Sequence, residues 1–299
     1  MEIDIPQASR KMEYIDILYI RIDLKPKSEA KFNRYTGFSI RSICYNIFRQ
    51  TKPYDPKIHD ENTPKPFSVS PLLSISNGDI HPCYYTSDRE VFFEVILNTG
   101  RIPISLFKNY FYVGREIRLD ENVFQITNVD IKNFLLGKYF QDIGNPVRFT
   151  LNFYTPTLFR YEVFHPYYSI EEMEISLLKK RSKNTIYHFY PEPKYLIRSI
   201  FRTLRDIYNI SFPDILIKDS IQYLIDGYLV ISRIEGMETR PLGDPPYKGF
   251  IGRVEYLFRD DTEDNKDMRE FIIRLLKFGE LFGVGVGRTN GMGRYKILI

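Results

Sequence analysis

Hydrophobic residues recur along the first half of the chain with two periods, one typical of strands and one typical of helices. Residues 14–23, YIDILYIRID, are β-branched and aromatic and partly alternate with polar positions, which predicts a strand. Residues 37–51 carry apolar side chains at helical spacing and Pro53 follows them, so a helix is expected there. The same reasoning predicts the later elements of this half: strands in 67–76 and 89–97, a short helix in 104–113 and a strand in 122–131.

The second half repeats this order of elements. Its expected elements are a strand in 146–155, a helix in 193–210, strands in 228–236 and 247–258, a helix in 267–282 and a last strand in 294–299. Each half therefore has the order strand, helix, strand, strand, helix, strand, which is typical of a ferredoxin-like domain. We expect an α+β fold of two tandem ferredoxin-like (RRM-like, βαββαβ) domains, residues 1–137 and 138–299, which meet near the stretch GKYFQDIGN.

The composition is that of a globular protein and narrows the function only modestly. Of 299 residues, 43% are apolar and 27% are charged, and the formal net charge of +4 is too small to identify a nucleic-acid binder by itself. The two cysteines, Cys44 and Cys83, cannot build a disulfide framework or a cysteine metal site. No stretch has the length and apolar character of a membrane span or a secretory signal, so we expect a cytoplasmic protein without membrane contact.

The most unusual stretch is the glycine-rich segment, residues 283–293, GVGVGRTNGMG. It follows a predicted helix and precedes the last strand, so it lacks the helix that receives the pyrophosphate in a dinucleotide site. A P-loop is also excluded, because no glycine is followed by Lys and Ser or Thr. Two interpretations remain: the glycines bring backbone amides close to phosphate oxygens, with charge from Arg288 and Arg294, or they relieve clashes at a tight connection.

The helix predicted at 37–51 carries a second candidate surface. At 100° per residue its apolar side chains fill one side, whereas Arg41, Tyr45 and Arg49 form a stripe about 150° away. Tyr45 is therefore expected to face outward among cations, with a half-buried tyrosine at a domain edge as the alternative.

A basic stripe also follows one edge of the helix predicted at 193–210. Its members are Lys194, Arg198, Arg202 and Arg205. The stripe is either a phosphate-binding face or a solvated helix side.

Three stretches together resemble a known family. The glycine-rich stretch FGVGVGRTNGMGRYKI, closing a second ferredoxin-like domain, resembles the carboxyl-terminal motif of the repeat-associated RNA-binding superfamily, and within it the CRISPR-associated repeat-cleaving endoribonucleases of the Cas6 family. IHDENTPKPFSVSPLL resembles the family's segment from a histidine to Lys-Phe, and YKGFIGRVEYLF resembles the strand before its last helix. The resemblance covers residues 36–73 and 247–299.

The resemblance implies a catalytic site formed by Tyr45, His59 and Lys65, which fall at the family's matching positions. RNA carries its own nucleophile in the 2′-hydroxyl, so cleavage needs a base, an acid for the departing 5′-oxygen and a cation, without a metal. We assign His59 as general acid, Tyr45 as base or orienter of the 2′-hydroxyl, and Lys65 as stabiliser of the transition-state phosphate. The products expected are a 2′,3′-cyclic phosphate end and a 5′-hydroxyl end.

The implied substrate is CRISPR repeat RNA, which would be cut into guide RNAs, and neither a metal nor a cofactor is expected. Further partners would be subunits of a CRISPR effector complex or a second copy of the chain. The residues expected to contact RNA are Arg41, Arg49, Arg198, Arg202, Gly283, Gly285, Gly287, Arg288, Thr289, Asn290, Gly291, Gly293 and Arg294.

Two other functions compete with this one. A non-catalytic subunit that holds guide RNA would also use the glycine-rich segment, but it would have no need for the Tyr, His and Lys trio. A metal-dependent nuclease or phosphatase would need clustered carboxylates. The acidic residues of RDDTEDNKD, from Asp260 to Asp267, crowd into one turn before a helix and are more typical of a helix cap and a solvated loop.

Overall fold

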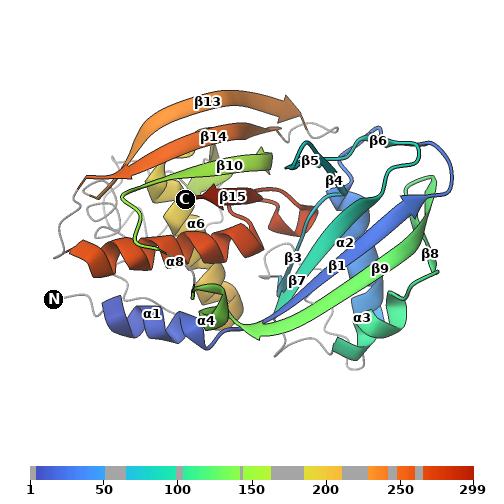
Figure 1. The fold of residues 1–299 in the computed structure, drawn as a ribbon, viewed down its shortest axis with the longest axis horizontal. Helices are drawn as coiled ribbons and strands as arrows, with labels where there is room; N and C mark the ends of the chain where they lie inside the picture. The colour runs from blue at the N-terminus through green and yellow to red at the C-terminus, as the bar shows by residue number, and fades with distance from the viewer. Residues whose placement is uncertain are drawn as a thin grey trace, which may run out of the picture.

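The computed structural model describes residues 5–50, 65–98, 104–141, 144–162, 185–210, 228–241, 248–259 and 265–299 (Figure 1). The elements of the first half are α1 (Ile5–Glu13), β1 (Asp16–Pro26), β2 (Ala30–Lys31), α2 (Gly37–Arg49), β3 (Phe67–Val69), β4 (Leu73–Ser76), β5 (Asp79–Pro82), β6 (Tyr85–Thr86), β7 (Val91–Asn98), α3 (Ile104–Tyr110), β8 (Glu116–Leu119), β9 (Asn122–Leu135) and α4 (Leu136–Tyr139). Those of the second half are β10 (Arg148–Thr157), β11 (Phe159–Glu162), β12 (Thr185–His188), α6 (Pro193–Tyr208), β13 (Leu229–Pro241), β14 (Lys248–Phe258), α8 (Lys266–Phe282), the 3₁₀ helix η4 (Arg288–Asn290) and β15 (Tyr295–Leu298).

The first half forms an antiparallel sheet with the order β5-β4-β7-β1-β9-β8. The strands β4, β7, β1 and β9, with α2 after β1 and α3 after β7, have the order of a ferredoxin-like sheet, and β5 and β8 extend it as hairpin partners. Apolar residues of α2, among them Ile40, Ile47 and Phe48, are buried against strand residues such as Ile20 and Val95. Both helices therefore cover one face of this sheet (Figure 1).

The second half forms a four-stranded antiparallel sheet with the order β13-β14-β10-β15. This is the same strand order as in the first half, with α6 and α8 as the two helices that pack against the sheet (Figure 1). The structure therefore confirms the α+β fold with two tandem ferredoxin-like domains.

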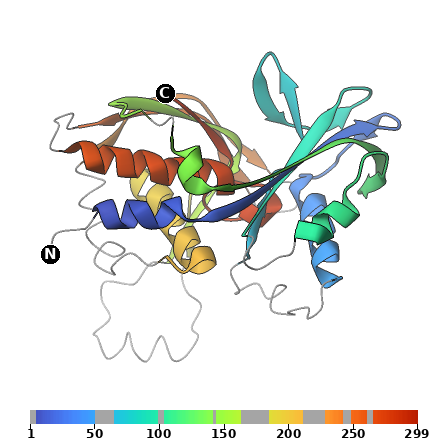
Figure 2. The same ribbon diagram turned by 60° about the horizontal axis from the view of Figure 1, so that its bottom comes forward.

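The two halves share a hydrophobic core at one end of the molecule. The helix α1 packs along α8, and the Glu13 carboxylate pairs with the Arg274 guanidinium (Figure 2). Three residues from outside the second domain's sheet are buried in the same cluster as residues of α6 and α8. They are Met12 of α1, Leu136 of α4 and Phe140, which follows α4. The segments that precede and follow the first sheet therefore pack against the second domain. The helix α4 spans the proposed boundary between residues 137 and 138.

The strand predicted at 67–76 is interrupted in the structure. Both β3 and β4 pair with β7, but the chain leaves the ladder between them, where Pro71 has no amide hydrogen to donate. The Ser70 hydroxyl replaces a ladder acceptor, since the Glu94 amide donates to it at 2.8 Å. The glycine-rich segment packs against the chain at this interruption, where Gly291 lies next to Ser70 and Pro71.

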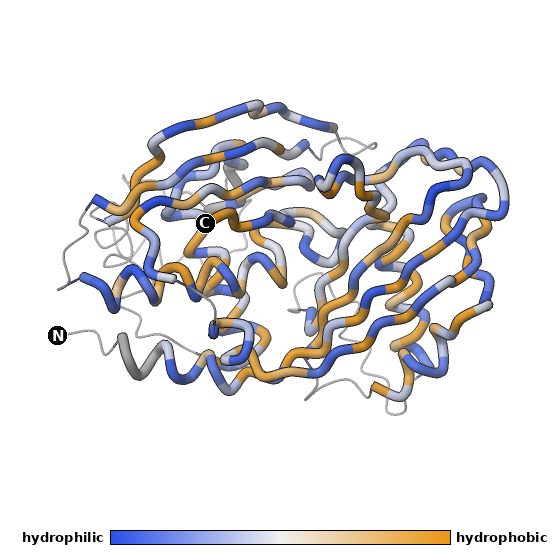
Figure 3. The backbone as a smooth tube through the Cα atoms, in the orientation of Figure 1, coloured by the Kyte–Doolittle hydropathy of each residue, from blue (hydrophilic) through white to orange (hydrophobic). Residues whose placement is uncertain are grey.

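The hydropathy pattern follows the predicted periods in both domains (Figure 3). Strand β7 is apolar at almost every position and is buried along most of its length, whereas β9 alternates more and is half-exposed. Within the described residues, no helix is long and apolar enough to cross a membrane.

Candidate functional site

The start of α2 and the glycine-rich segment touch although they belong to different domains. A Cβ on Gly37 would lie 1.8 Å from the Asn290 carbonyl oxygen, so only glycine at position 37 allows this approach. Arg41, one turn further along α2, donates from Nη1 to Asn290 Oδ1 at 2.9 Å. The Tyr35 hydroxyl donates to the Gly291 carbonyl at 2.7 Å. The contact between α2 and η4 is thus a close junction between the domains, which we call the α2–η4 junction (Gly37, Arg41, Asn290).

The glycine-rich segment is held mainly by the protein itself. Its glycines at 283, 285, 287, 291 and 293 all have φ between 74° and 80°, a region that other residues rarely adopt. A Cβ on Gly291 would lie 2.5 Å from the Pro71 nitrogen, and one on Gly293 would lie 1.8 Å from the Val284 carbonyl oxygen. Backbone amides at 283–286 and 290–294 donate to acceptors inside the protein. The second interpretation from the sequence, relief of clashes at a tight connection, therefore accounts for most of these glycines.

For the RNA cleavage that the sequence resemblance implies, substituting Gly37 with alanine is expected to lower the rate by about 10- to 100-fold, because displacing a site by about 1 Å has effects of this size. The added methyl group would push η4 away from α2 and separate Arg41 from Asn290. Single-turnover kinetics with repeat RNA measure this. Gly144→Ala is the matched control, since a Cβ there meets nothing within 4 Å. Equal rates for the two variants would show that the junction does not position the site.

Tyr45 is buried rather than outward-facing, which corrects the expectation from the helical wheel. Its side chain is 7% exposed, and its ring meets those of Phe48 and Phe67 edge-on, with centroids 6.4 and 5.5 Å away. The wheel placed Tyr45 opposite the face of α2 that packs on the sheet, but β3 covers this side too. The phenol oxygen still lies 3.4 Å from Arg41 Nη2, so a fixed ring presents its hydroxyl to a cation.

Of the other two residues of the expected trio, the structure describes Lys65 but not His59. Lys65 lies two residues before Phe67, at the entry to β3, and is 9% exposed. Because Phe67 contacts the Tyr45 ring, the entry to β3 runs beside α2. His59 falls outside the described residues. The structure thus brings Tyr45 and Arg41 together next to the start of β3, which Lys65 shortly precedes, while the place of His59 stays a prediction.

Arg288, the first residue of η4, is half-buried, and its guanidinium lies near α6. Burial lowers the pKa of its guanidinium to about 10, an effect that the Asp206 carboxylate opposes and the Arg202 guanidinium reinforces. Within the described part of the chain, its buried Nη1 atom has no hydrogen-bond partner, and the same holds for Arg41 Nε. Two buried guanidinium nitrogens near η4 therefore lack an acceptor, which is costly unless a ligand supplies one.

Arg294 corrects a second expectation, that it contacts RNA through its side chain. The side chain is 1% exposed, and its Nε donates to the Val69 carbonyl at 3.3 Å while Nη1 donates to the Leu281 carbonyl. Its Nη1 also lies 3.7 Å from a Glu94 carboxylate oxygen. Arg294 instead ties the first sheet to the end of α8. The sequence offers no local signal for this role, since burial arises only when the two domains meet.

The other expected RNA contacts lie nearer to the surface. Arg49 at the end of α2 and both Arg198 and Arg202 on α6 are exposed, and Thr289 and Asn290 of η4 are partly exposed. The predicted face of α6 is therefore solvent-accessible. Its outer end is partly neutralised, because Asp206 lies 3.5 Å from Arg202 and 2.8 Å from Arg205.

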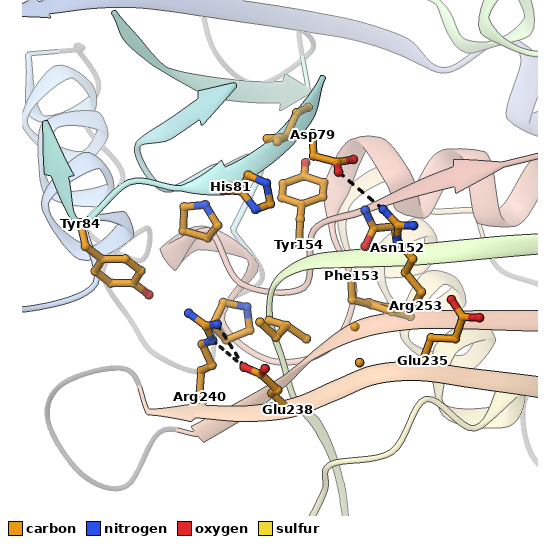
Figure 4. A pocket seen from close by; sticks show the side chains of 16 residues that line it. Asp79, His81, Tyr84, Asn152, Phe153, Tyr154, Glu235, Glu238, Arg240 and Arg253 are labelled. Carbon is orange, nitrogen blue, oxygen red and sulfur yellow. Dashed lines mark hydrogen bonds and ion pairs between the residues drawn. The ribbon is translucent and has the colours of Figure 1, made fainter. Parts of the chain in front are cut away.

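A cavity of about 340 Å³ lies elsewhere, between the β4–β5 hairpin and the second sheet (Figure 4). The cations that line it face carboxylates: Arg253 lies 3.6 Å from Asp79, and Arg240 lies 3.0 Å from Glu238. Its charges are thus balanced, and none of the residues that the sequence singled out lines it. Because its cations are already paired, this cavity is a weaker candidate for phosphate binding than the α2–η4 junction.

Metal ligands do not gather in the part of the chain that the structure describes, where no three His, Cys, Asp or Glu residues form a group able to hold an ion. Of the acidic stretch before α8, Asp260, Asp261, Glu263 and Asp264 lie outside the described residues. Asp267 lies in the first turn of α8, where a negative charge interacts favourably with the helix dipole.

Two ferredoxin-like domains, with the glycine-rich segment of the second packed against α2 of the first, define the class of tandem ferredoxin-like proteins. Within it, residues 151–295 match the model of the family described as CRISPR-associated endoribonuclease Cas6. This match covers most of the carboxyl-terminal domain and confirms the resemblance to the Cas6 family that the glycine-rich segment predicted. No curated protein matches the chain.

Solved structures similar to this chain agree with the family. The Cas6 of Thermus thermophilus, in a product complex, has a TM-score of 0.66 at 14% identity, over 94% of this chain and 100% of that one. Another Cas6 structure, a substrate mimic complex, has a TM-score of 0.62 at 18% identity, over 95% and 100% of the two chains. A Cas6-related protein from Pyrococcus furiosus has a TM-score of 0.53 at 12% identity, over 94% and 98%. At these identities the likeness concerns the fold.

Proposed function

We propose that this chain is a metal-independent endoribonuclease that cleaves CRISPR repeat RNA into guide RNAs. The family match covers the domain that carries the glycine-rich segment, and two of the similar structures hold a product and a substrate mimic. The scissile phosphate would lie at the α2–η4 junction, near the entry to β3.

The observation that carries this proposal is the junction itself. Arg41 joins the two domains by its bond to Asn290, and the same guanidinium lies beside the Tyr45 hydroxyl. The buried nitrogens Arg41 Nε and Arg288 Nη1 lack acceptors in the described part of the chain. A phosphodiester would supply anionic acceptors for such donors, and charge-assisted hydrogen bonds of this kind are roughly twice as strong as neutral ones.

The chemistry follows from RNA's own nucleophile. Tyr45 takes or orients the proton of the 2′-hydroxyl, and the 2′-oxygen forms a bond to the adjacent phosphorus. The bond from phosphorus to the 5′-oxygen breaks, and His59 gives that oxygen a proton, which leaves a 2′,3′-cyclic phosphate and a 5′-hydroxyl. Lys65 offsets the charge that builds on the phosphate oxygens. Of these residues, Tyr45 has the Arg41 cation beside its oxygen.

Binding along α6 is expected to be electrostatic. Replacing both Arg198 and Arg202 with alanine should flatten the slope of log binding constant against log salt by about 0.7 for each phosphate that the protein no longer neutralises. Fluorescence anisotropy with a non-cleavable repeat RNA over a range of salt concentrations gives this slope. Arg118→Ala, which removes another exposed arginine, on β8 of the first domain, should leave the slope unchanged. An unchanged slope in the double variant would remove α6 from the RNA path.

Product analysis tests the proposed reaction. In the presence of EDTA, repeat RNA should be cut at one position, and the upstream fragment should have the mass of a 2′,3′-cyclic phosphate, one water lighter than the linear monophosphate. A 3′-hydroxyl on that fragment, or cleavage that starts only when Mg²⁺ is added, would point to metal-dependent hydrolysis. Tight binding without any cleavage would point to the non-catalytic subunit.

A further inference from the structure

We propose that the β11–β12 hairpin and the first turns of α6 form a binding platform for an unpaired RNA strand that continues from the cleavage site. The platform consists of Tyr187, Phe189 and Tyr190, with Arg160 beside Tyr187 and Arg198 further along α6. This inference rests on the proposed function, because it concerns the same RNA.

Three large aromatic side chains are exposed within four residues. Tyr187 is 42% exposed, Phe189 is 40% and Tyr190 is 38%. Between them, His188 takes the opposite side: it pairs with Phe159, which is 2% exposed, and its ring lies 4.4 Å from the Tyr195 ring. Since successive strand residues alternate between faces, Tyr187 faces outward, and the exposed Phe189 follows directly after the strand ends. The three rings are therefore not part of the core and lie close together at the surface.

One arginine lies beside these rings, and a second lies on α6, one turn after the Tyr195 ring that contacts His188. Arg160 is the cross-strand partner of Tyr187, so the two side chains stand next to each other on the same face. Arg160 and Arg198 are both exposed, and among the described residues no carboxylate forms an ion pair with either. Lys194, by contrast, lies 2.8 Å from a Glu192 oxygen. Exposed rings with an exposed arginine beside them fit a single nucleic-acid strand, whose bases stack while its phosphates meet the cation.

Two hydrogen bonds join the glycine-rich segment to the elements that carry the platform residues. The Val286 amide donates to the Leu158 carbonyl at 2.8 Å, and the Gly285 amide donates to the Ser199 hydroxyl at 2.6 Å. The glycine-rich segment therefore contacts both the start of β11 and the middle of α6. From there the exposed Arg202 and Arg198 follow α6 toward the platform. Figure 2 shows α6 on the same side of the molecule as α2.

The test compares RNAs that differ only in their unpaired ends. The probe is a repeat RNA with a 2′-deoxy nucleotide at the scissile position, made in a full-length form and in forms trimmed on the 5′ or the 3′ side of the cut. Alanine at Tyr187 should weaken binding of the full-length RNA by about 5- to 100-fold, the range for removal of one base stack. The effect should vanish for the form that lacks the stacked side.

Two further variants separate stacking from folding. Tyr187→Phe keeps the ring and should retain full binding. Tyr112→Ala, which removes an exposed tyrosine of the first domain, should also bind normally. If Tyr187→Ala and Tyr190→Ala bind every RNA like the wild type, the platform does not hold RNA and the inference is wrong, even where wild-type cleavage shows that the proposed function is right. Equal weakening for the full-length and both trimmed forms would likewise overturn it.

Discussion

Alanine at His59 is expected to lower the rate of repeat-RNA cleavage by about 10²- to 10⁴-fold, the contribution of one positioned general acid or base. The substituted enzyme cannot protonate the departing 5′-oxygen, so that oxygen must leave as an alkoxide. Single-turnover kinetics at saturating RNA measure the chemical step directly. Binding of a 2′-deoxy repeat RNA should change little, because the imidazole acts on the transition state and not on the bound substrate.

The matched control is His81→Ala. His81 is an exposed histidine on β5 and lines the charge-balanced cavity rather than the α2–η4 junction. Its removal should leave the rate unchanged. Added imidazole should restore part of the rate to His59→Ala, since imidazolium can supply the proton that the missing side chain no longer gives. A full rate in His59→Ala without imidazole would exclude this residue from the proton transfers.

Methionine at Arg294 is expected to destabilise the fold by about 3–5 kcal/mol, the usual effect of removing one partner from a buried ion pair. The substitution leaves the Glu94 carboxylate without its cation and the carbonyls of Val69 and Leu281 without their donor. Because these groups belong to β7, β3 and α8, the substitution should loosen the two domains from each other. Urea unfolding followed by circular dichroism measures the change.

Arg233→Met provides the comparison for that stability measurement. Arg233 pairs with Glu235 at 2.8 Å, but its side chain is 70% exposed, and exposed pairs contribute about 0–1 kcal/mol. If Arg294→Met unfolds at the same urea concentration as Arg233→Met, the buried guanidinium does not hold the domains together.

The sequence predicts well the elements that local patterns determine. The helix expected at 37–51 spans Gly37–Arg49, and the helix expected at 267–282 spans Lys266–Phe282. Their apolar residues recur at helical spacing, which is visible without knowledge of the partner surface. The break between β3 and β4 is absent from the sequence-based prediction, although Pro71 inside the expected strand is a signal for it.

The features that the sequence does not predict depend on contacts between distant segments. Tyr45 is buried because β3 covers the side of α2 that the wheel left open. Arg294 is buried because two domains close around it. The helix α1 precedes every predicted element, yet Met12 enters the core of the second domain. No single window of residues holds this information.

The stacking platform belongs to the same group of features. Tyr187 and Phe189 lie at alternate positions along and just after a short strand that the sequence-based prediction does not contain. The pairing of Arg160 with Tyr187 spans residues that are close only in the folded hairpin. An aromatic stretch beside a basic helix, YHFYPEPKYLIR, is the available signal.

Substitution of the 2′-hydroxyl at the scissile nucleotide tests the central claim most directly. Two repeat RNAs, identical except for ribose or deoxyribose at that position, are incubated with the wild-type protein in EDTA and again with Mg²⁺. The account predicts that the ribose RNA is cut at the same rate in both solutions and that the deoxyribose RNA is cut in neither. Cleavage of the deoxyribose RNA, or of the ribose RNA only when Mg²⁺ is present, would contradict it.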